Sequence, residues 1–134
     1  MPTVNNPTLT LTTVNDKVTI RVTYTASFKT FERQLVDLGM TYDSHVTVHP
    51  IDNGTDVGNS IVTLQEPIPV TVGNGDQDIV VVQSSLPIDR SELQEDPGLG
   101  NDDEWQAKIR IHAQQWLADP FTADVFTATQ VLTG

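Results

Sequence analysis

The sequence predicts an all-β protein: an antiparallel β-sandwich of about seven strands that forms one domain over residues 1–134. Valine and threonine are frequent, and β-branched side chains suit a pleated, half-buried surface. Several segments alternate apolar and polar residues with a period of two, which is the pattern of a strand with one buried face. Turn-forming residues separate these segments, and the chain is long enough to bury one core.

The first two strands are predicted over residues 8–14 and 17–26, where apolar and polar side chains alternate. Asn15-Asp16 lies between these segments, and both residue types tolerate positive φ in a tight turn. The sequence therefore predicts a hairpin near the N-terminus.

A short helix is predicted over about residues 31–38, because the apolar period changes there. Phe31, Leu35 and Leu38 follow the i, i+4, i+7 spacing of one helical face. Thr30 is the expected cap, and Gly39 can adopt the left-handed conformation after the last turn. We expect this helix to cover one end of the core with its apolar face.

The middle of the chain predicts further strands at 40–49 and 60–66, followed by two prolines that indicate an edge or a bend. Residues 70–72 predict a short strand and 73–78 a turn. Residues 79–86 are apolar on both faces at their start, which predicts a central strand.

The C-terminal third predicts a helical turn and two more strands. Asp89 and Glu92 have the spacing of a capping box, which predicts a helical turn over about 90–95. Residues 105–113 alternate clearly, and 121–132 form the last predicted strand.

The segment Asn101-Asp102-Asp103-Glu104-Trp105-Gln106-Ala107, after the helical turn capped by Asp89 and Glu92, resembles the E–F corner of immunoglobulin-like domains. In this resemblance Trp105 takes the position of the corner tyrosine and Ala107 that of the second cysteine. It implies an immunoglobulin-like strand order, in which the strand 40–49 pairs with 105–113. The chain departs from the pattern because it has no cysteine, no hydroxyl at the corner and no tryptophan on the third strand. A resemblance in strand order alone implies a fold and no specific function.

The net charge of −11 lies entirely in the segment 52–104, which carries twelve acidic residues and one basic residue. The segments on either side are each balanced. Such a surface repels nucleic acid and anionic membranes, so neither is an expected partner. It could bind a basic protein partner or a cation, or it could maintain solubility.

The acidic loops form a candidate calcium site. In an immunoglobulin-like order, loops 52–60 and 95–104 lie at the same end of the sandwich, and calcium is bound by carboxylate and carbonyl oxygens on flexible loops. The loop sequence does not have the ligand spacing of an EF-hand, so a solvated loop is the alternative interpretation. The candidate ligands are Asp52, Asp56, Glu95, Asp96, Asp102 and Asp103.

A second candidate metal site uses histidines. His45 and His49 share the outward face of one strand but stand about 13 Å apart, which is too far for one ion. His112 lies on the outward face of 105–113, so one of the pair could approach it, and with Asp43 these side chains could bind zinc or copper. The alternative is a polar, solvent-facing surface with scattered histidines.

Catalytic motifs are missing: there is no cysteine, no Gly-x-Ser-x-Gly elbow and no glycine-rich phosphate loop. We therefore expect no enzyme and no required cofactor, with Ca²⁺ as the first candidate ion and a transition metal at the histidines as the less favoured one. The N-terminal residues contain neither a basic nor an apolar region of a signal peptide, and no apolar run is long enough for a membrane span. A cytoplasmic location, or export without a leader, is the default expectation.

Three functions follow from the sequence. The first is a non-enzymatic structural or interaction module that binds a protein partner or self-associates, because threonine-rich outward faces and two-sided apolar strands permit pairing at sheet edges. The second is a calcium-dependent binding module that uses the acidic loops. The third is a metal-binding protein or an enzyme that uses the outward histidine face.

Overall fold

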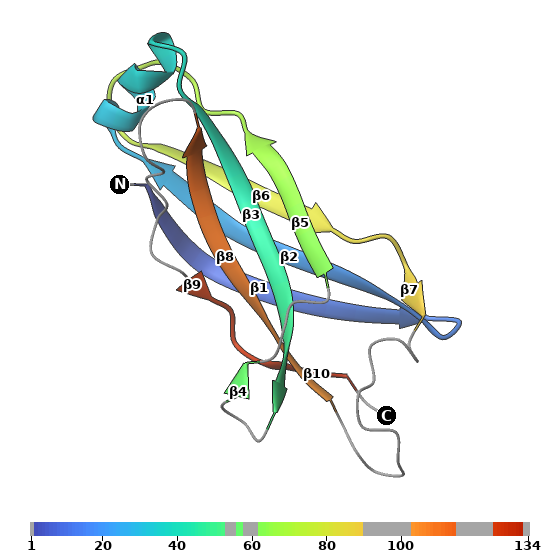
Figure 1. Ribbon diagram of the computed structural model, residues 1–134. Helices are drawn as coiled ribbons and strands as arrows, with labels where there is room; N and C mark the ends of the chain where they lie inside the picture. The colour runs from blue at the N-terminus through green and yellow to red at the C-terminus, as the bar shows by residue number, and fades with distance from the viewer. Residues whose placement is uncertain (1, 53–55, 58–61, 90–102, 115–124, 133–134) are drawn as a thin grey trace.

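The computed structural model describes residues 2–52, 56–57, 62–89, 103–114 and 125–132, and it consists of two antiparallel sheets packed face to face (Figure 1). This confirms the predicted all-β sandwich with one short helix. The first sheet has the order β1-β2-β6, with β7 also pairing with β2. Its strands are β1 (Thr3–Val14), β2 (Lys17–Phe28), β6 (Gln77–Ser84) and β7 (Ile88–Asp89).

The second sheet has the order β10-β8-β3-β4, with β5 pairing with β3 and β9 with β8. Its longest pairing is between β3 and β8, from Thr41 opposite Gln114 to Ile51 opposite Glu104. The predicted pairing of the strand 40–49 with 105–113 is therefore confirmed. The strands are β3 (Thr41–Asp52), β4 (Asp56–Val57), β5 (Val62–Ile68), β8 (Asp103–Gln114), β9 (Val125–Phe126) and β10 (Gln130–Leu132).

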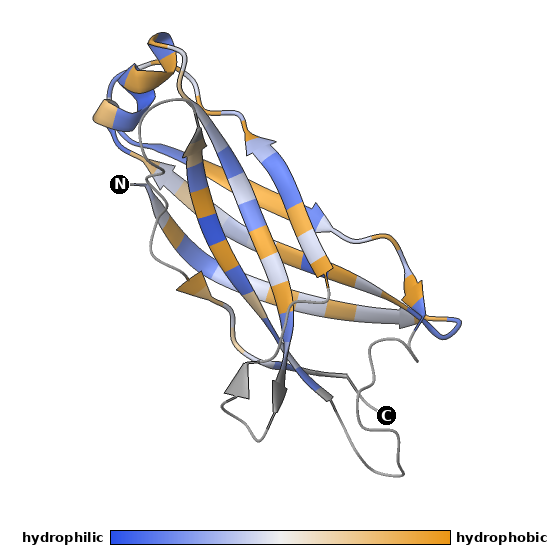
Figure 2. Cartoon of the chain, viewed as in Figure 1, coloured by the Kyte–Doolittle hydropathy of each residue, from blue (hydrophilic) through white to orange (hydrophobic). Residues whose placement is uncertain are grey.

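The core lies between the sheets and is built from the alternating apolar positions of the strands. Figure 2 shows this alternation clearly along β3 and β8. Burying one face of each sheet removes apolar surface from water and is the main stabilising term of such a fold. The largest fully buried apolar side chains are Trp105, Tyr24, Phe28, Leu9, Ile20, Ile109 and Ile111.

The N-terminal hairpin is confirmed, with Val14 opposite Lys17 at its closed end. The two turn residues, Asn15 and Asp16, have φ values of 51° and 62°. Positive φ at both central residues gives the turn that matches the right-handed twist of the two strands. The Asn-Asp pair therefore fixes the register of β1 against β2 from Val14 back to Thr8.

The helix α1 (Thr30–Asp37) is confirmed, and Gly39 has the expected positive φ of 98°. The predicted inward face is wrong, because Phe31 is 70% exposed and Leu38 is 63% exposed. Glu32 is buried instead: its carboxylate accepts the Lys29 N–H at 3.1 Å, and its carbonyl accepts the Tyr42 hydroxyl at 2.9 Å. These hydrogen bonds orient the first turn of the helix so that Glu32 faces the protein interior. Leu35, one turn later, is partly buried against the core.

Two predictions for the β5–β6 region are also wrong. Residues 70–72 are not a strand, because the Thr71 N–H bonds to the Gln77 side chain rather than to another strand. The strand predicted at 79–86 is not central, since β6 ends the sheet order β1-β2-β6 of the described residues. Its outward residues Val80 and Val82 are 67% and 41% exposed, so the apolar run is buried on one face only.

The predicted last strand, 121–132, is two short strands, β9 and β10, separated by residues 127–129. The predicted helical turn at 90–95 and Glu92 lie outside the described residues. Asp89 lies in β7, opposite Lys17 of β2, and its carboxylate is 2.6 Å from the Lys17 ammonium.

None of the helical structure among the described residues is long and apolar enough to cross a membrane.

Candidate functional site

The candidate site is the outer edge of β6, which the sheet order leaves without a neighbouring strand in the described part of the chain. The Ser85 N–H donates to the Ile20 carbonyl, so Ser85 and Ile20 form a hydrogen-bonded pair of β6 and β2. From there the pairing runs without interruption from Ser84 opposite Arg21 to Gln77 opposite Phe28. Opposite residues alternate between hydrogen-bonded and non-hydrogen-bonded pairs in an antiparallel ladder. The peptide groups that point away from β2 are therefore those of Asp78, Val80, Val82 and Ser84, which we call the open edge.

The open edge has an apolar centre and is regular. Val80 and Val82 project from the outer face of the sheet, while Val81 and Gln83 are buried on the inner face. The register with β2 runs from Gln77 to Ser84 without a bulge. None of the described residues supplies a hydrogen-bond partner for the peptide groups of the open edge.

The other long edges have features that block strand addition. β1 has a register shift between Asn5 and Thr8, where Asn6 has a φ of 53° and Pro7 has no N–H to donate. β5 has Pro67 in its pairing with β3, next to the exposed carboxylate side chain of Glu66. Prolines, bulges and charges are the devices that protect edges, and β6 has none of them from residue 79 to residue 84.

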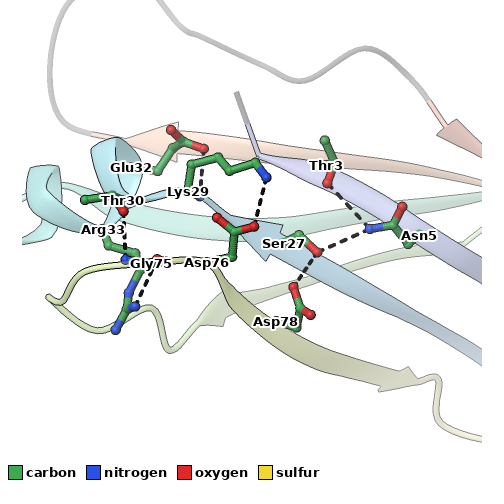
Figure 3. Close-up of polar contacts among 10 residues, drawn as sticks. All are labelled: Thr3, Asn5, Ser27, Lys29, Thr30, Glu32, Arg33, Gly75, Asp76 and Asp78. Atoms are coloured by element: carbon green, nitrogen blue, oxygen red, sulfur yellow. Dashed lines mark hydrogen bonds and ion pairs between the residues drawn. The ribbon is translucent and has the colours of Figure 1, made fainter.

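The start of β6 is held by a set of contacts from α1 and its N-cap, and Figure 3 shows those made to Gly75 and Asp76. The Arg33 guanidinium donates to the carbonyls of Thr71, Asn74 and Gly75 at 3.0–3.1 Å. The Gly75 N–H donates to the Thr30 hydroxyl at 2.7 Å, and the Lys29 ammonium lies 2.9 Å from the Asp76 carboxylate. This carboxylate raises the pKa of Lys29 through its hydrogen bond and its charge. Residues 71–76, which lead into the open edge, are thereby fixed to the helix.

A row of polar side chains crosses the outer face at the end of the open edge (Figure 3). The Ser27 hydroxyl donates to the Asp78 carboxylate at 2.7 Å, and the Asn5 amide donates to the Ser27 hydroxyl at 3.2 Å. This row joins β1, β2 and β6 and uses Oδ1 of Asp78. Strand β6 is thus held in place on the face from which Val80 and Val82 project.

On the inner face, β6 is held by a buried polar chain from three strands. The Tyr24 hydroxyl donates to Ser44 Oγ, and the Ser44 hydroxyl donates to Gln83 Oε1. Burial raises the pKa of Tyr24 to about 12, with the hydrogen bond to Ser44 opposing this and the charge of Glu66 adding to it. Gln83 Nε2 is buried with no hydrogen-bond partner among the described residues. The sequence signal for this chain was Ser44, a polar residue in phase with the apolar positions of its strand.

The predicted transition-metal ligands lie on one sheet face but do not converge. Asp43 is the cross-strand partner of His112, whereas His45 lies opposite Arg110. His49 is buried, and its Nε2 lies 2.7 Å from the Thr47 hydroxyl. Across the ranges that the structure describes, no group of three His, Cys, Asp or Glu residues could hold a metal ion.

Part of the predicted acidic pole can be located from its backbone. Asp52 and Asp56 are cross-strand partners in the β3–β4 hairpin, and Asp103 begins β8 at the same end, next to the pair of Ile51 and Glu104. The remaining candidate calcium ligands, Glu95, Asp96 and Asp102, lie outside the described residues.

The residues of the predicted corner serve packing and local pairing. Trp105 is fully buried, and its indole N–H has no partner within the described residues. The Ala107 N–H donates to the Thr127 hydroxyl at 3.0 Å, and the Thr127 N–H donates to the Ala107 carbonyl at 2.9 Å. Thr127, which no pattern in the sequence indicates, therefore attaches the residues between β9 and β10 to β8.

Comparisons of the sequence with protein-family models, with curated proteins and with solved structures give no match.

Proposed function

We propose that the protein is a non-enzymatic structural or interaction module that binds protein chains by strand addition at the open edge of β6. The observation that carries the proposal is that the peptide groups of Asp78, Val80, Val82 and Ser84 have no partner within the described residues. An extended segment placed beside β6 would satisfy these groups, and its side chains would pack against Val80 and Val82 on the outer face. The main-chain hydrogen bonds would supply affinity, and the valines would favour an apolar side chain at alternate positions.

The rigidity of the edge supports this proposal. Contacts from α1 hold the chain just before β6, and the buried chain from Tyr24 to Gln83 holds its inner face. A binding strand that is already ordered loses little conformational entropy when a partner arrives. Strand addition would therefore require ordering of the partner segment alone.

The strand order supports the further proposal that the sandwich is immunoglobulin-like. In that order the first, second and fifth long strands share a sheet, as β1, β2 and β6 do. The third and sixth long strands pair in the other sheet, as β3 and β8 do, while β5 lies beside β3. In our proposal the acidic side chains of segment 52–104 keep the protein soluble, and binding at the edge uses the peptide groups and valines of β6 rather than this negative charge.

Selection of peptides from a random twelve-residue library tests the proposal. We expect the wild-type protein to enrich peptides with alternating apolar residues. The double variant Val80→Lys, Val82→Lys should lose these peptides, because the lysines remove the apolar cross-strand contacts on the outer face and charged edge residues oppose strand addition. Val14→Lys with Leu38→Lys is the matched control, since it makes the same charge change at exposed apolar positions away from β6.

Two outcomes would contradict the proposal. One is enrichment of peptides whose binding survives the lysines at positions 80 and 82. The other is enrichment of lysine- and arginine-rich peptides that dissociate in salt, which would assign binding to the acidic segment instead. Circular dichroism of each variant confirms that the sandwich is retained.

A further inference from the structure

We infer that the chain that adds to the open edge is a second copy of this protein, paired antiparallel through its own β6, with Val81 of both copies on the two-fold axis. This inference rests on the proposed function and specifies the partner. A two-fold dimer uses the same surface on both copies, so the surface must be complementary to itself. The open edge has this property in both its backbone and its side chains.

The backbone complementarity follows from the positions of the outward peptide groups. With Val81 on the axis, Val80 lies opposite Val82 of the second copy, and Asp78 lies opposite Ser84 of the second copy. Every outward residue of one copy then faces an outward residue of the other, so each pair can exchange two hydrogen bonds. A shift by one residue would place outward groups against groups already bonded to β2.

The side chains match in the same register. Cross-strand partners lie on the same face with their β-carbons about 4.5–5.5 Å apart. Val80 therefore packs on Val82 of the second copy. The two-fold axis repeats this valine pair, so part of the exposed apolar surface of all four valines is covered. Asp78 uses Oδ1 to bind Ser27, which leaves Oδ2 to accept the Ser84 hydroxyl of the second copy.

Registers shifted by two residues lack this match. If Val80 faces its own equivalent, Asp78 lies opposite Val82, and Ser84 has no outward partner. If Val82 faces its own equivalent, Ser84 lies opposite Val80, and Asp78 has no outward partner. Each of these registers loses one pair and sets a polar side chain against a valine. The sequence of β6 thus favours the register centred on Val81.

Charge affects this dimer in a specific direction. The two Asp78 residues are about 20 Å apart in the proposed register, so they do not oppose pairing locally. Each copy nevertheless carries a net charge of −11, so the copies repel each other at low ionic strength. Salt screens this repulsion. We therefore expect the dimer to strengthen with salt, whereas binding of a basic partner would weaken.

Sedimentation equilibrium over a range of protein concentrations tests the inference. The mass should rise from 14.7 kDa to twice that value. The rise should occur at lower protein concentration in about 0.5 M than in about 0.05 M NaCl, because the Debye length is about three times shorter at the higher salt. Val80→Lys with Val82→Lys should give the monomer mass throughout. Val14→Lys with Leu38→Lys, with the same net charge, should dimerise at least as readily as the wild type.

Disulfide trapping tests the register, and the absence of native cysteine makes it unambiguous. Val80→Cys and Val82→Cys chains, one of them carrying a mass tag, are mixed and oxidised. The 80-to-82 cross-link should form at least ten times faster than either symmetric cross-link, because only that pair is adjacent in the proposed register. Faster 80-to-80 or 82-to-82 linkage would overturn the register.

The two proposals can fail separately. Suppose that the protein is a monomer at all concentrations and salt conditions, and that peptides still bind in a manner sensitive to positions 80 and 82. This result would overturn the proposal that a second copy is the partner and would retain strand addition. A dimer that survives the lysines at positions 80 and 82 would place self-association elsewhere. A monomer that also binds no peptide at the edge would overturn both.

Discussion

Gly73 lies directly against the guanidinium of Arg33, so that a β-carbon added at Gly73 would be 2.3 Å from Arg33 Nη2. The same guanidinium holds three carbonyls of the loop before β6. We predict that Gly73→Ala displaces the guanidinium and destabilises the fold by about 1–3 kcal/mol, because hydrogen bonds to a charged donor are lost. Urea unfolding measures the change.

A double-mutant cycle with Arg33→Ala tests the cause of this loss. If the alanine acts by displacing Arg33, the double variant should be little less stable than Arg33→Ala alone. Gly75→Ala is the comparison: Gly75 has open space around it but a φ of 87°, so its cost arises from backbone strain. Full additivity of Gly73→Ala with Arg33→Ala would contradict the displacement mechanism.

Ser44 is the middle member of the buried chain from Tyr24 to Gln83, so its removal affects both neighbours. We predict that Ser44→Ala lowers the free energy of unfolding by about 2–3 kcal/mol, because the tyrosine hydroxyl and the glutamine amide lose their partners in a site without water access. Tyr24→Phe removes one terminal group and should cost less. Equal losses for the two variants, measured in urea, would show that the chain does not act as a unit.

Both tyrosines of the protein have a raised pKa, so they lose their protons at a higher pH than a free tyrosine does. Burial, with a smaller contribution from Glu32, raises the pKa of Tyr42 to about 12, and the pKa of Tyr24 is also about 12. The unfolded chain loses these protons near pH 10, before the folded chain does. The contribution of the tyrosines to stability should therefore be constant below about pH 10 and fall between about pH 10 and 12, by at most about 1.4 kcal/mol per pH unit for each tyrosine.

Absorbance of tyrosinate in the folded protein checks this prediction directly, together with urea unfolding between pH 8 and 11, a range that spans the ordinary pKa of about 10. Tyr24→Phe and Tyr42→Phe should each reduce the slope of stability against pH. A native titration midpoint close to that of free tyrosine would contradict the assignment of both hydroxyls to buried hydrogen bonds.

The orientation of α1 can be tested with two matched substitutions. Phe31 is largely exposed, so Phe31→Gln should change the free energy of unfolding by less than about 0.5 kcal/mol. Leu35 packs against the core, so Leu35→Gln should cost at least about 1 kcal/mol. The reverse order in thermal or urea unfolding would restore the apolar face that periodicity alone predicts.

Much of the fold is readable from local pattern. The alternation of residues 17–26 with a period of two predicts β2 because side chains of a strand point to opposite faces. Asn15-Asp16 predicts the hairpin because few residue types tolerate positive φ. The pairing of β3 with β8 followed from a resemblance in strand order, and the structure confirms it.

The candidate site was not readable in this way. The apolar run at 79–82 indicates which faces of the strand are buried. The open edge depends instead on whether another strand lies beside β6 in the sheet. Hydropathy cannot distinguish a central strand from an edge strand. Neighbouring strands bond through peptide groups, and these are the same for every residue except proline, so the side-chain pattern does not show whether a neighbour is present. That His112 lies opposite Asp43, rather than opposite another histidine, likewise depends on the register between distant strands.

By itself, the sequence determined the long strands, the first turn, the helix and the concentration of charge in residues 52–104. These features depend on side-chain periodicity, on turn chemistry and on composition, all of which act over a few residues. The tertiary structure decided that Glu32 rather than Phe31 faces inward, that Ser44 joins Tyr24 to Gln83, and that β6 ends its sheet. Each of these outcomes depends on hydrogen-bond partners supplied by distant segments, which only the folded chain brings together.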